Sequence, residues 1–328
     1  MPLRRPARRG PDAGRDVTAT LPGRTGTGAT YPVTMDFTLA HGTANDFVLL
    51  PDLDDRLELS ASLVRALADR RRGLGADGVI RIGSGGDHAD AFMDYRNADG
   101  GVVEMCGNGV RVVAKHLVDH GLADPGGDGV LRIGTRAGVK PVRIMERHPD
   151  GRIATVAVDM GPPILEPDAV PFDADDPAAL RHHLDLDGEV VGFSVVSMGN
   201  PHAVLIVEDV DAAAVHRLGP QLEHDPHFPA GVNVGFAEVR ADDHLRLRVW
   251  ERGVGETAAC GTGACAAVVA LQRLGLTGTR VTVELPGGSL QIEHTAGGTV
   301  IMTGPAVEVA HGTLDDGWLA DVHDDSEE

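Results

Sequence analysis

The chain has 328 residues, 42% of them hydrophobic and 24% charged, as in a globular protein of one or two domains. A net charge of −20 and an aromatic content of 3% argue against a nucleic-acid-binding surface. Three cysteines cannot form a disulfide framework, and only Lys115 and Lys140 are available for a pyridoxal-phosphate Schiff base. We therefore expect a reducing, cytoplasmic location and no nucleic-acid partner.

The basic first segment differs in composition from the rest of the chain. Residues 1–34 carry six arginines and many Gly, Pro and Thr residues, but lack the apolar core of a signal peptide. We predict a disordered basic extension there. The segment at 190–207 contains no Asp, Glu, Lys or Arg. Because Gly-Asn-Pro-His interrupts it at 199–202, two strands joined by a turn are favoured over a membrane helix.

The sequence also repeats at one long period. Cys106-Gly-Asn-Gly and Cys260-Gly-Thr-Gly lie 154 positions apart (260 − 106), and a similar tract precedes each cysteine. Two further tracts recur 155 positions later, in the same order. These pairs of tracts are 45–50 with 200–205, and 75–80 with 230–235. Three matches at a nearly constant offset predict two homologous halves.

Each cysteine is expected at a junction between a strand and a helix. Alternating apolar residues at 91–95 and at 245–249 predict half-buried strands. Apolar positions 110, 113, 114, 117 and 118, and then 264, 267, 268 and 271, predict amphipathic helices. Gly121 and Gly275 are suitable helix stops. Cys106 and Cys260 are thus predicted to begin two equivalent buried helices.

Two thiols in such positions suit one kind of reaction. A helix N-terminus lowers a thiol pKa and binds carboxylates, and the flanking glycines allow close approach of a ligand. If the thiols face each other, one can remove a proton from carbon while the other delivers a proton to the opposite face. The helix N–H groups would act as an oxyanion hole. Cys265 has no counterpart, since residue 111 is Arg, and we interpret it as a packing residue.

The combined motifs resemble the diaminopimelate epimerase family. They are HGTANDF at 41–47, MCGNG at 105–109, GNPH at 199–202, and WERGVGET followed by ACGTG within 250–263. The resemblance covers residues 35–311. Proline racemases and hydroxyproline epimerases also use two cysteines, but their motifs usually read Cys-Gly-His-Gly and Asp-Arg-Ser-Pro. The resemblance implies an isomerase that converts LL-diaminopimelate to meso-diaminopimelate in lysine and peptidoglycan precursor biosynthesis.

The resemblance also assigns roles to residues. Cys106 and Cys260 would be the acid and base, while His202 and Glu251 would orient them and tune their pKa values. Arg252 would bind the distal carboxylate. The substrate-binding residues implied are Asn45, Asn97, Gly107, Asn108, Asn200, Asn233, Glu251, Arg252, Gly261 and Thr262. Asn45, Asn200 and Asn233 can also be read as turn residues.

Two positions depart from the family pattern. Ala44 replaces a glycine, and Gly78 stands where many members carry a substrate-contacting glutamine. These departures concern substrate affinity rather than proton transfer. A proline- or hydroxyproline-type racemase, a single-cysteine thiol hydrolase and a catalytically silent binding protein stay open as alternatives.

The implied architecture is α/β (α+β), with two pseudo-symmetric homologous domains. Each is a mixed sheet around a central helix, and the active site lies in the interdomain cleft. We expect one domain from 35–155 plus about 304–314 and a second from 156–303. Residues 315–328 contain seven acidic side chains and are predicted to be a solvated tail. The resemblance implies no cofactor, metal or membrane association, diaminopimelate as the small-molecule partner, and a homodimer.

Overall fold

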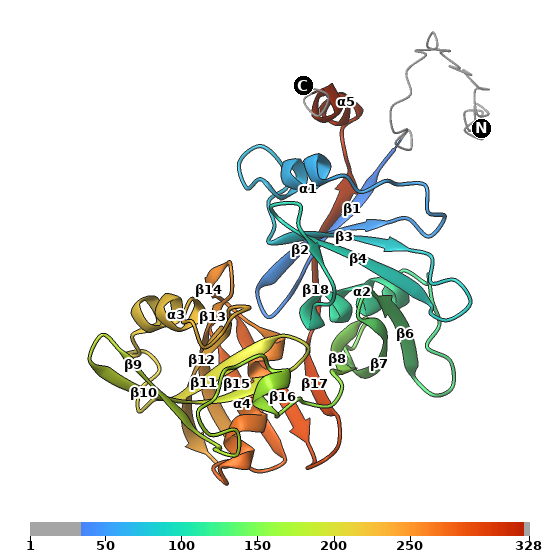
Figure 1. Ribbon diagram of the computed structural model, residues 1–328. Coiled ribbons are helices and arrows are strands. Elements are labelled where there is room, and N and C mark those ends of the chain that lie inside the picture. The colour runs from blue at the N-terminus through green and yellow to red at the C-terminus, as the bar shows by residue number, and fades with distance from the viewer. Residues whose placement is uncertain (1–33, 325–328) are drawn as a thin grey trace, which may run out of the picture. The chain divides into compact units, whose positions relative to one another are not determined.

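The computed structural model describes residues 34–324 of the chain. The predicted disordered extension at 1–34 therefore lies outside the described residues, except for its last position. Within 34–324 the chain builds the same arrangement of strands and helices twice (Figure 1). The sequence repeat thus corresponds to a structural repeat, and the predicted mixed α/β fold is confirmed.

The first half is a mixed sheet. Strands β1 and β2 are antiparallel, β2 and β3 parallel, β3 and β4 antiparallel, β4 and β6 parallel, and β6, β7 and β8 successively antiparallel. Its elements are β1 (Asp36–Gly42), β2 (Asn45–Pro51), α1 (Ala61–Ala68), β3 (Gly78–Gly83), β4 (Ala91–Asn97), β5 (Val102–Val103), α2 (Gly107–Asp119), β6 (Val130–Thr135), β7 (Gly138–Arg147) and β8 (Ile153–Asp159).

The second half repeats this pairing pattern strand for strand. The connecting segment before it forms a short 3-10 helix, η1 (Pro167–Ala169), and β9 (His182–Leu186), which pairs with β10. The repeated elements are β10 (Glu189–Ser197), β11 (Pro201–Ile206), α3 (Val215–Glu223), β12 (Asn233–Ala241), β13 (His244–Glu251), β14 (Gly255–Thr257), α4 (Gly261–Arg273), β15 (Arg280–Leu285), β16 (Gly288–His294) and β17 (Val300–Pro305).

Two strand pairings join segments that are distant in sequence. The last strand of each repeat pairs with the other, β8 with β17 in antiparallel register, for example Asp159 opposite Ile301. The chain then continues into β18 (Val307–Thr313), which pairs antiparallel with β1, so that Thr313 lies opposite Asp36. The C-terminal strand of the sheet therefore lies beside its first strand.

The two central helices follow the sequence pattern. Apolar side chains of α2 and α4, such as Val113, Leu117, Val268 and Leu271, are fully buried in one hydrophobic cluster formed by both halves. Burying a side chain of this size contributes about 1.5–3 kcal/mol. After α2, Gly121 has a φ of +66°, a conformation that terminates helices and favours glycine. The predicted helices after both cysteines and the strands before them are confirmed.

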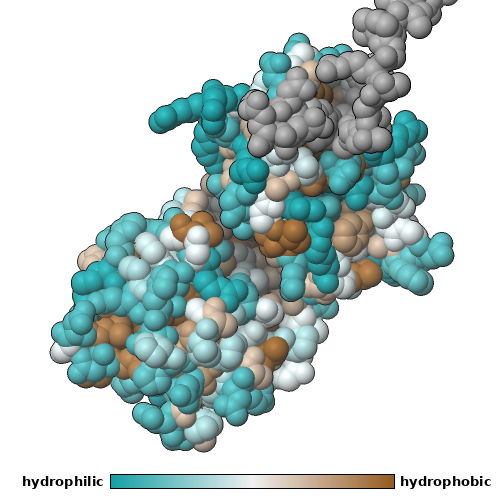
Figure 2. Space-filling view, turned by 45° about the horizontal axis from the view of Figure 1, so that its top comes forward, coloured by the Kyte–Doolittle hydropathy of each residue, from teal (hydrophilic) through white to brown (hydrophobic). Residues whose placement is uncertain are grey.

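The segment at 190–207 forms β10 and β11, as predicted, rather than a helix. Among residues 34–324, no helix combines the length and apolar character needed to cross a membrane. The face shown in Figure 2 is mostly hydrophilic, with hydrophobic residues in small groups.

The prediction of a solvated acidic tail is wrong for most of that segment. Residues Asp316–Asp324 form a helix, α5, which contacts α1. Leu319 is only 5% exposed, and Trp318 packs with it against the cluster that contains Leu63. The acidic composition concealed these apolar residues, which lie on one face of the helix. Residues 325–328 lie outside the described part of the chain.

The β1–β2 turn provides a test of backbone strain. Thr43 and Ala44 occupy it with φ values of 52° and 61°, so both adopt the left-handed conformation that a two-residue type I′ turn requires. Ala44 is exposed, and this conformation costs a residue with a Cβ about 1–2 kcal/mol. We expect Ala44→Gly to raise the free energy of unfolding by up to about 1 kcal/mol in urea titrations, after the entropy that glycine adds to the unfolded chain.

The neighbouring turn residue is a matched control. Thr43 is buried, and its hydroxyl accepts a hydrogen bond from Arg111. Thr43→Gly should therefore destabilise the protein although it relieves the same backbone strain. Equal effects of the two substitutions would contradict this interpretation.

Candidate active site

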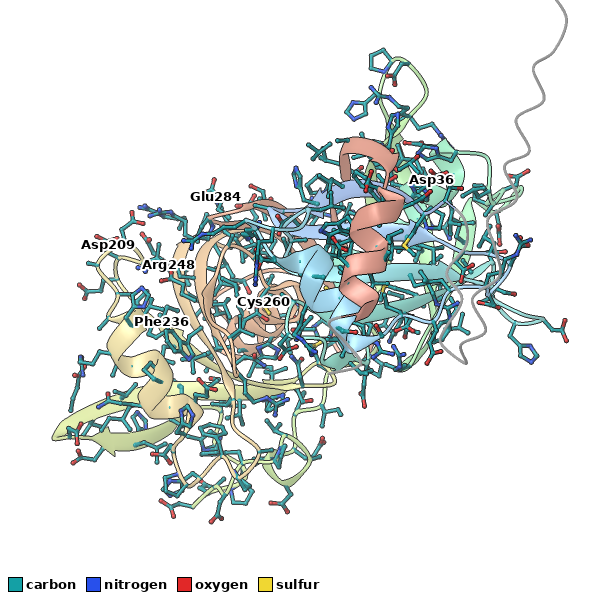
Figure 3. The ribbon with its side chains drawn as sticks, turned by 90° about the horizontal axis from the view of Figure 1, so that it is seen from above. Asp36, Asp209, Phe236, Arg248, Cys260 and Glu284 are labelled. Atoms are coloured by element: carbon teal, nitrogen blue, oxygen red, sulfur yellow. The ribbon has the colours of Figure 1, made fainter. Side chains whose placement is uncertain are left out.

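Both motif cysteines are N-cap residues of the central helices. Cys106 precedes α2 with φ −141° and ψ 117°, and Cys260 precedes α4 with φ −118° and ψ 111°. The Gly109 N–H donates to Cys106 Sγ at 3.5 Å, and Cys260 Sγ lies 3.4 Å from the Thr262 hydroxyl. In Figure 3 Cys260 lies in the interior, while Asp209 and Glu284 lie toward the periphery. Each thiol is therefore placed at a helix N-terminus, as predicted.

The N-termini of the two helices meet at one side chain. A Cβ on Gly107 would lie 2.5 Å from Met302 Cε, and a Cβ on Gly261 would lie 2.9 Å from Met302 Sδ. Residues with a Cβ are therefore excluded at the first position of both helices without repacking. The Asn108 side chain reaches the other half, where its Nδ2 donates to the Ala259 carbonyl at 3.4 Å. The repeat thus brings its two equivalent helix ends together.

Glu251 is the charged group that affects both thiols. It is half-buried at the end of β13 and accepts a hydrogen bond from the Thr257 hydroxyl at 2.5 Å. Its charge acts in the direction that raises the pKa of both Cys106 and Cys260. Burial raises the pKa of Glu251 itself. This location fits the tuning role predicted for Glu251.

The expected lowering of the thiol pKa values is wrong, because burial acts in the opposite direction. Burial raises the pKa of Cys106, and it raises that of Cys260 well above its ordinary value. The N–H of Gly109 lowers the pKa of Cys106, and that of Gly263 lowers the pKa of Cys260, but neither outweighs the loss of solvation. Burial therefore acts more strongly on both thiols than the helix N-terminus does. The motifs reveal the helix N-terminus but not the burial around it.

Two predicted residues of the first half, Asn45 and Asn108, form a hydrogen-bonded pair beside Cys106. Asn45 Oδ1 lies 3.8 Å from Cys106 Sγ and accepts a hydrogen bond from Asn108 Nδ2 at 3.2 Å. Asn45 Nδ2 in turn donates to Asp77 at 2.9 Å. Asn97, at the end of β4, accepts a hydrogen bond from the Tyr95 hydroxyl at 2.9 Å. The side-chain amide of Asn108 thus holds the site together.

The second half contributes the other predicted residues. His202 is buried, and its Nε2 lies 3.0 Å from Asn200 Oδ1. Asn233 donates to the Pro201 carbonyl at 2.9 Å and accepts from the Arg252 backbone N–H at 3.0 Å. Asn233 therefore positions the strand end that carries Arg252, and a direct contact between Asn233 and substrate stays a prediction.

Arg252 is exposed and has no carboxylate within ion-pair distance among residues 34–324. Its Nη1 donates to the Ala230 carbonyl at 2.6 Å, and its side chain packs beside Gly231. A guanidinium held on one side and open on the other can receive a carboxylate through two parallel hydrogen bonds.

The Gly78 departure has a structural explanation. A Cβ at Gly78 would lie 2.5 Å from Tyr95 Cε2 and 2.5 Å from the Arg96 carbonyl oxygen. The Tyr95 ring therefore occupies the space that a side chain at position 78 would need, and its hydroxyl reaches Asn97. Tyr95 and Gly78 lie on neighbouring strands, a pairing that sequence motifs alone do not reveal.

Arg111 is the main site residue that the sequence analysis missed. Its side chain is fully buried, and its Nη2 donates to Asn108 Oδ1 at 2.9 Å and to the Thr43 hydroxyl at 3.0 Å. Its Nε donates to the Pro305 carbonyl at 3.2 Å, where β17 leads into β18. No carboxylate pairs with it in the described chain. The signal in the sequence was a charged residue within the otherwise apolar run at 110–114.

His202 provides a test by pH. Burial, together with the charge of Arg252, lowers its pKa to about 3, whereas an unfolded histidine titrates near about 6.5. As the pH falls below about 6.5, the unfolded chain binds a proton at this histidine that the folded chain does not bind. The free energy of unfolding therefore falls as the pH falls. We expect this group alone to cost about 2 kcal/mol at about pH 5. His202→Gln should remove that part of the slope in denaturation curves between pH 7 and pH 5; an unchanged slope would contradict the assignment.

The fold and the two N-cap cysteines define the class of protein. The crystal structure of a probable proline racemase from Agrobacterium radiobacter K84 matches with a TM-score of 0.64 at 18% identity, covering 86% of this chain and 93% of that one. At this identity the match shows the fold alone. The chain is therefore a two-half α/β protein of this fold, with a cysteine at the start of each central helix.

Sequence comparison places the chain in one family. The diaminopimelate epimerase family model matches residues 37–166 and 194–309. A diaminopimelate epimerase of Halorhodospira halophila is 50% identical over 287 residues, covering 86% of this chain and 95% of that protein. One from Ectopseudomonas mendocina is 46% identical over 281 residues, covering 85% and 98%. The chain belongs to the diaminopimelate epimerase family and is an amino-acid epimerase. The predicted resemblance is confirmed, and the racemase and hydrolase alternatives are not favoured.

Proposed function

We propose that the chain interconverts LL- and meso-diaminopimelate, with Cys106 and Cys260 as the two proton-transfer groups. The observation that carries the proposal is the pair of equivalent thiols at two helix N-termini that meet at Met302. The curated relatives supply the substrate, since they bear the name diaminopimelate epimerase.

In the proposed reaction one cysteine thiol first loses its proton to solvent as the substrate binds, and the resulting thiolate takes the α-proton and becomes a thiol again. The electron pair of the broken C–H bond is left on the α-carbon and delocalised into the α-carboxylate. The thiol on the opposite face then gives its proton to that carbon and becomes a thiolate. The substrate leaves with inverted configuration, and the reverse reaction exchanges the two roles.

The helix N-termini address the main difficulty, which is the low acidity of the α-proton. Backbone N–H groups of Gly107, Asn108, Gly261 and Thr262 lie at helix starts, where the partial positive charge stabilises a carboxylate. A single oxyanion-hole donor is typically worth about 3–4 kcal/mol, so several donors must act together. Exclusion of water around the half-buried Cys106 and the buried Cys260 strengthens each of these donors.

The distal end of the substrate would be recognised by Glu251 and Arg252, which lie at the end of β13. Arg252 would bind the distal carboxylate, because its guanidinium is exposed and unpaired within residues 34–324. Glu251 would bind an ammonium group and at the same time tune both thiols. Asn45, Asn97, Asn200 and Asn233 would complete the polar surface. Proline offers a single carboxylate, so Arg252 also favours diaminopimelate over a proline-type substrate.

The test is conversion of LL-diaminopimelate to the meso form by the pure protein with no added cofactor, followed by chiral chromatography. We expect conversion to an equilibrium mixture from either isomer, and none with L-proline or trans-4-hydroxy-L-proline. Absence of conversion by a folded, fully reduced protein would contradict the proposal. Conversion of proline instead would support the racemase alternative.

The assembly, domain division and location also stay proposals. We propose domains of about 35–155 with 304–314 and of 156–303, a cleft between them as the site, a homodimer and a cytoplasmic location. The pairing of β18 with β1 supports the division, and the three free thiols support a reducing compartment. Light scattering of the purified protein would give the number of chains.

A further inference from the structure

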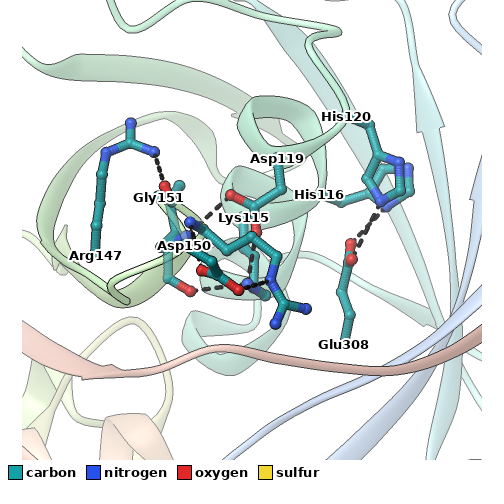
Figure 4. A network of polar contacts seen from close by, with 10 residues as sticks. Lys115, His116, Asp119, His120, Arg147, Asp150, Gly151 and Glu308 are labelled. Atoms are coloured by element: carbon teal, nitrogen blue, oxygen red, sulfur yellow. Dashed lines mark hydrogen bonds and ion pairs between the residues drawn. The ribbon is translucent and has the colours of Figure 1, made fainter.

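Three potential metal ligands converge at the end of α2 that is remote from Cys106. His116 lies in the last turn of α2, and His120 is its C-cap, one helical turn further on. Glu308 lies on β18 and faces both imidazoles, although it follows them by 192 and 188 positions (Figure 4). The two histidines share one face of the helix because residues i and i+4 are neighbours there.

The ligand atoms are close to the spacing that a small cation requires. His116 Nδ1 lies 2.9 Å from Glu308 Oε1, and His120 Nε2 lies 3.1 Å from Glu308 Oε2. The candidate ligand atoms of the three residues all lie within 4.8 Å of one another. Tetrahedral zinc, with ligand distances of about 2.0–2.1 Å, holds its ligand atoms roughly 3.3 Å apart. The two histidine–glutamate separations are therefore nearly correct, and only the two imidazoles must approach each other.

The surroundings favour a site that is anchored on one side and open on the other. The His116 side chain is 4% exposed and that of Glu308 is 16% exposed, so packing fixes both. The His120 side chain is 39% exposed, which leaves that side accessible to an ion and a water ligand.

We propose that His116, His120 and Glu308 form a binding site for a divalent transition-metal ion of the zinc type, separate from the proposed catalytic pair. Two imidazoles and one carboxylate are a ligand set that zinc accepts. The ion would replace the two N–H···O contacts with Glu308, and the displaced protons would pass to solvent. No covalent or redox step is involved. The bound ion would fasten β18 to α2.

The consequence for the fold is local. β18 is held by its pairing with β1 and is the segment that returns the chain to the first half. A cross-link between α2 and β18 should stabilise the folded state by mass action, because the unfolded chain does not hold the three ligands together. The inference does not depend on the proposed reaction, and its test uses binding rather than activity.

The test uses the full chain with both Cys106 and Cys260 replaced by serine, so that these thiols cannot bind the probe. Titration with CoCl2, followed by visible absorption, should show one ion per chain and no thiolate-to-cobalt band in the ultraviolet. ZnCl2 should displace the cobalt and raise the melting temperature. His120→Ala and Glu308→Gln should each weaken binding at least about tenfold, because loss of even an outer-sphere partner commonly costs 10–100-fold. The His120 side chain is accessible, and glutamine has the same shape as the glutamate it replaces at position 308. Neither substitution should therefore disturb α2.

His148→Ala is the matched control, since His148 is an exposed histidine in the β7–β8 turn. It should leave cobalt affinity and the zinc-dependent rise in melting temperature unchanged. The proposal is overturned if the double-serine protein binds no stoichiometric ion, which would leave the cluster as an ion pair between histidine and glutamate. It is equally overturned if binding survives both His120→Ala and Glu308→Gln.

Discussion

Replacing Cys106 or Cys260 with serine, one at a time, is expected to lower kcat for epimerisation by about 10²–10⁴, the range that a proton-transfer group typically contributes. Serine preserves the N-cap geometry and the size of the side chain, but its hydroxyl is a far weaker acid than a thiol. Because each thiol serves one face of the α-carbon, both substitutions should impair conversion in both directions. Initial rates from LL- and from meso-diaminopimelate measure this.

Cys265 is the matched control for the cysteine substitutions. It is a third free thiol, fully buried in α4, and belongs to the shared hydrophobic cluster. Cys265→Ala should lower stability slightly through lost packing and leave kcat unchanged within about twofold. If one of the two substitutions, at Cys106 or at Cys260, leaves kcat nearly unchanged, the protein uses a single cysteine, as a thiol hydrolase does. That result would contradict the two-base account.

Replacing Arg111 with methionine should produce the second large effect. The substitution removes the Arg111 donor from Asn108 Oδ1, the Thr43 hydroxyl and the Pro305 carbonyl, and Asn108 Oδ1 keeps only the longer hydrogen bond from the Thr43 hydroxyl, at 3.4 Å. A buried polar group left unsatisfied costs about 1–3 kcal/mol. Removal of a buried cation offsets part of this cost. We expect a loss of a few kcal/mol in the free energy of unfolding and at least about a tenfold loss in kcat/KM, since the Asn108 amide that borders Asn45 and Cys106 loses its charged hydrogen-bond donor.

A lysine at the same position separates charge from hydrogen bonding. Arg111 lowers the pKa of Cys106, and its own pKa of about 10, lowered by burial, leaves it charged at neutral pH. Arg111→Met should therefore shift the acidic limb of the kcat/KM profile to higher pH. Arg111→Lys should return that limb toward the wild-type position while stability stays reduced. An unchanged pH profile in Arg111→Met would show that the residue is structural only.

Much of the fold could be predicted because local patterns and the repeat agree. The strand before each cysteine, the helix after it and the paired strands at 190–207 follow from side-chain periodicity and turn residues. The positions of Cys106 and Cys260 at helix starts follow from the glycines beside them. Such features depend on interactions between residues that are close in sequence, so one amino-acid sequence is enough to predict them.

The rest depends on contacts between distant segments. The burial of Arg111 is set by β17 and the β1–β2 turn, and the Tyr95 ring fills the space at Gly78 from a neighbouring strand. The thiol pKa values were predicted in the wrong direction because desolvation arises from packing that no motif specifies. The buried face of α5 was hidden by acidic neighbours such as Asp316.

The most direct test of the two-base mechanism is the position of deuterium in the first turnovers in deuterated water. With LL-diaminopimelate at low conversion, the base cysteine keeps the proton it removes while the opposite thiol delivers solvent deuterium. The account predicts that nearly every meso product molecule carries one α-deuterium, while the remaining LL substrate carries almost none. Product that retains its original proton, or LL substrate that exchanges as fast as product forms, would contradict it.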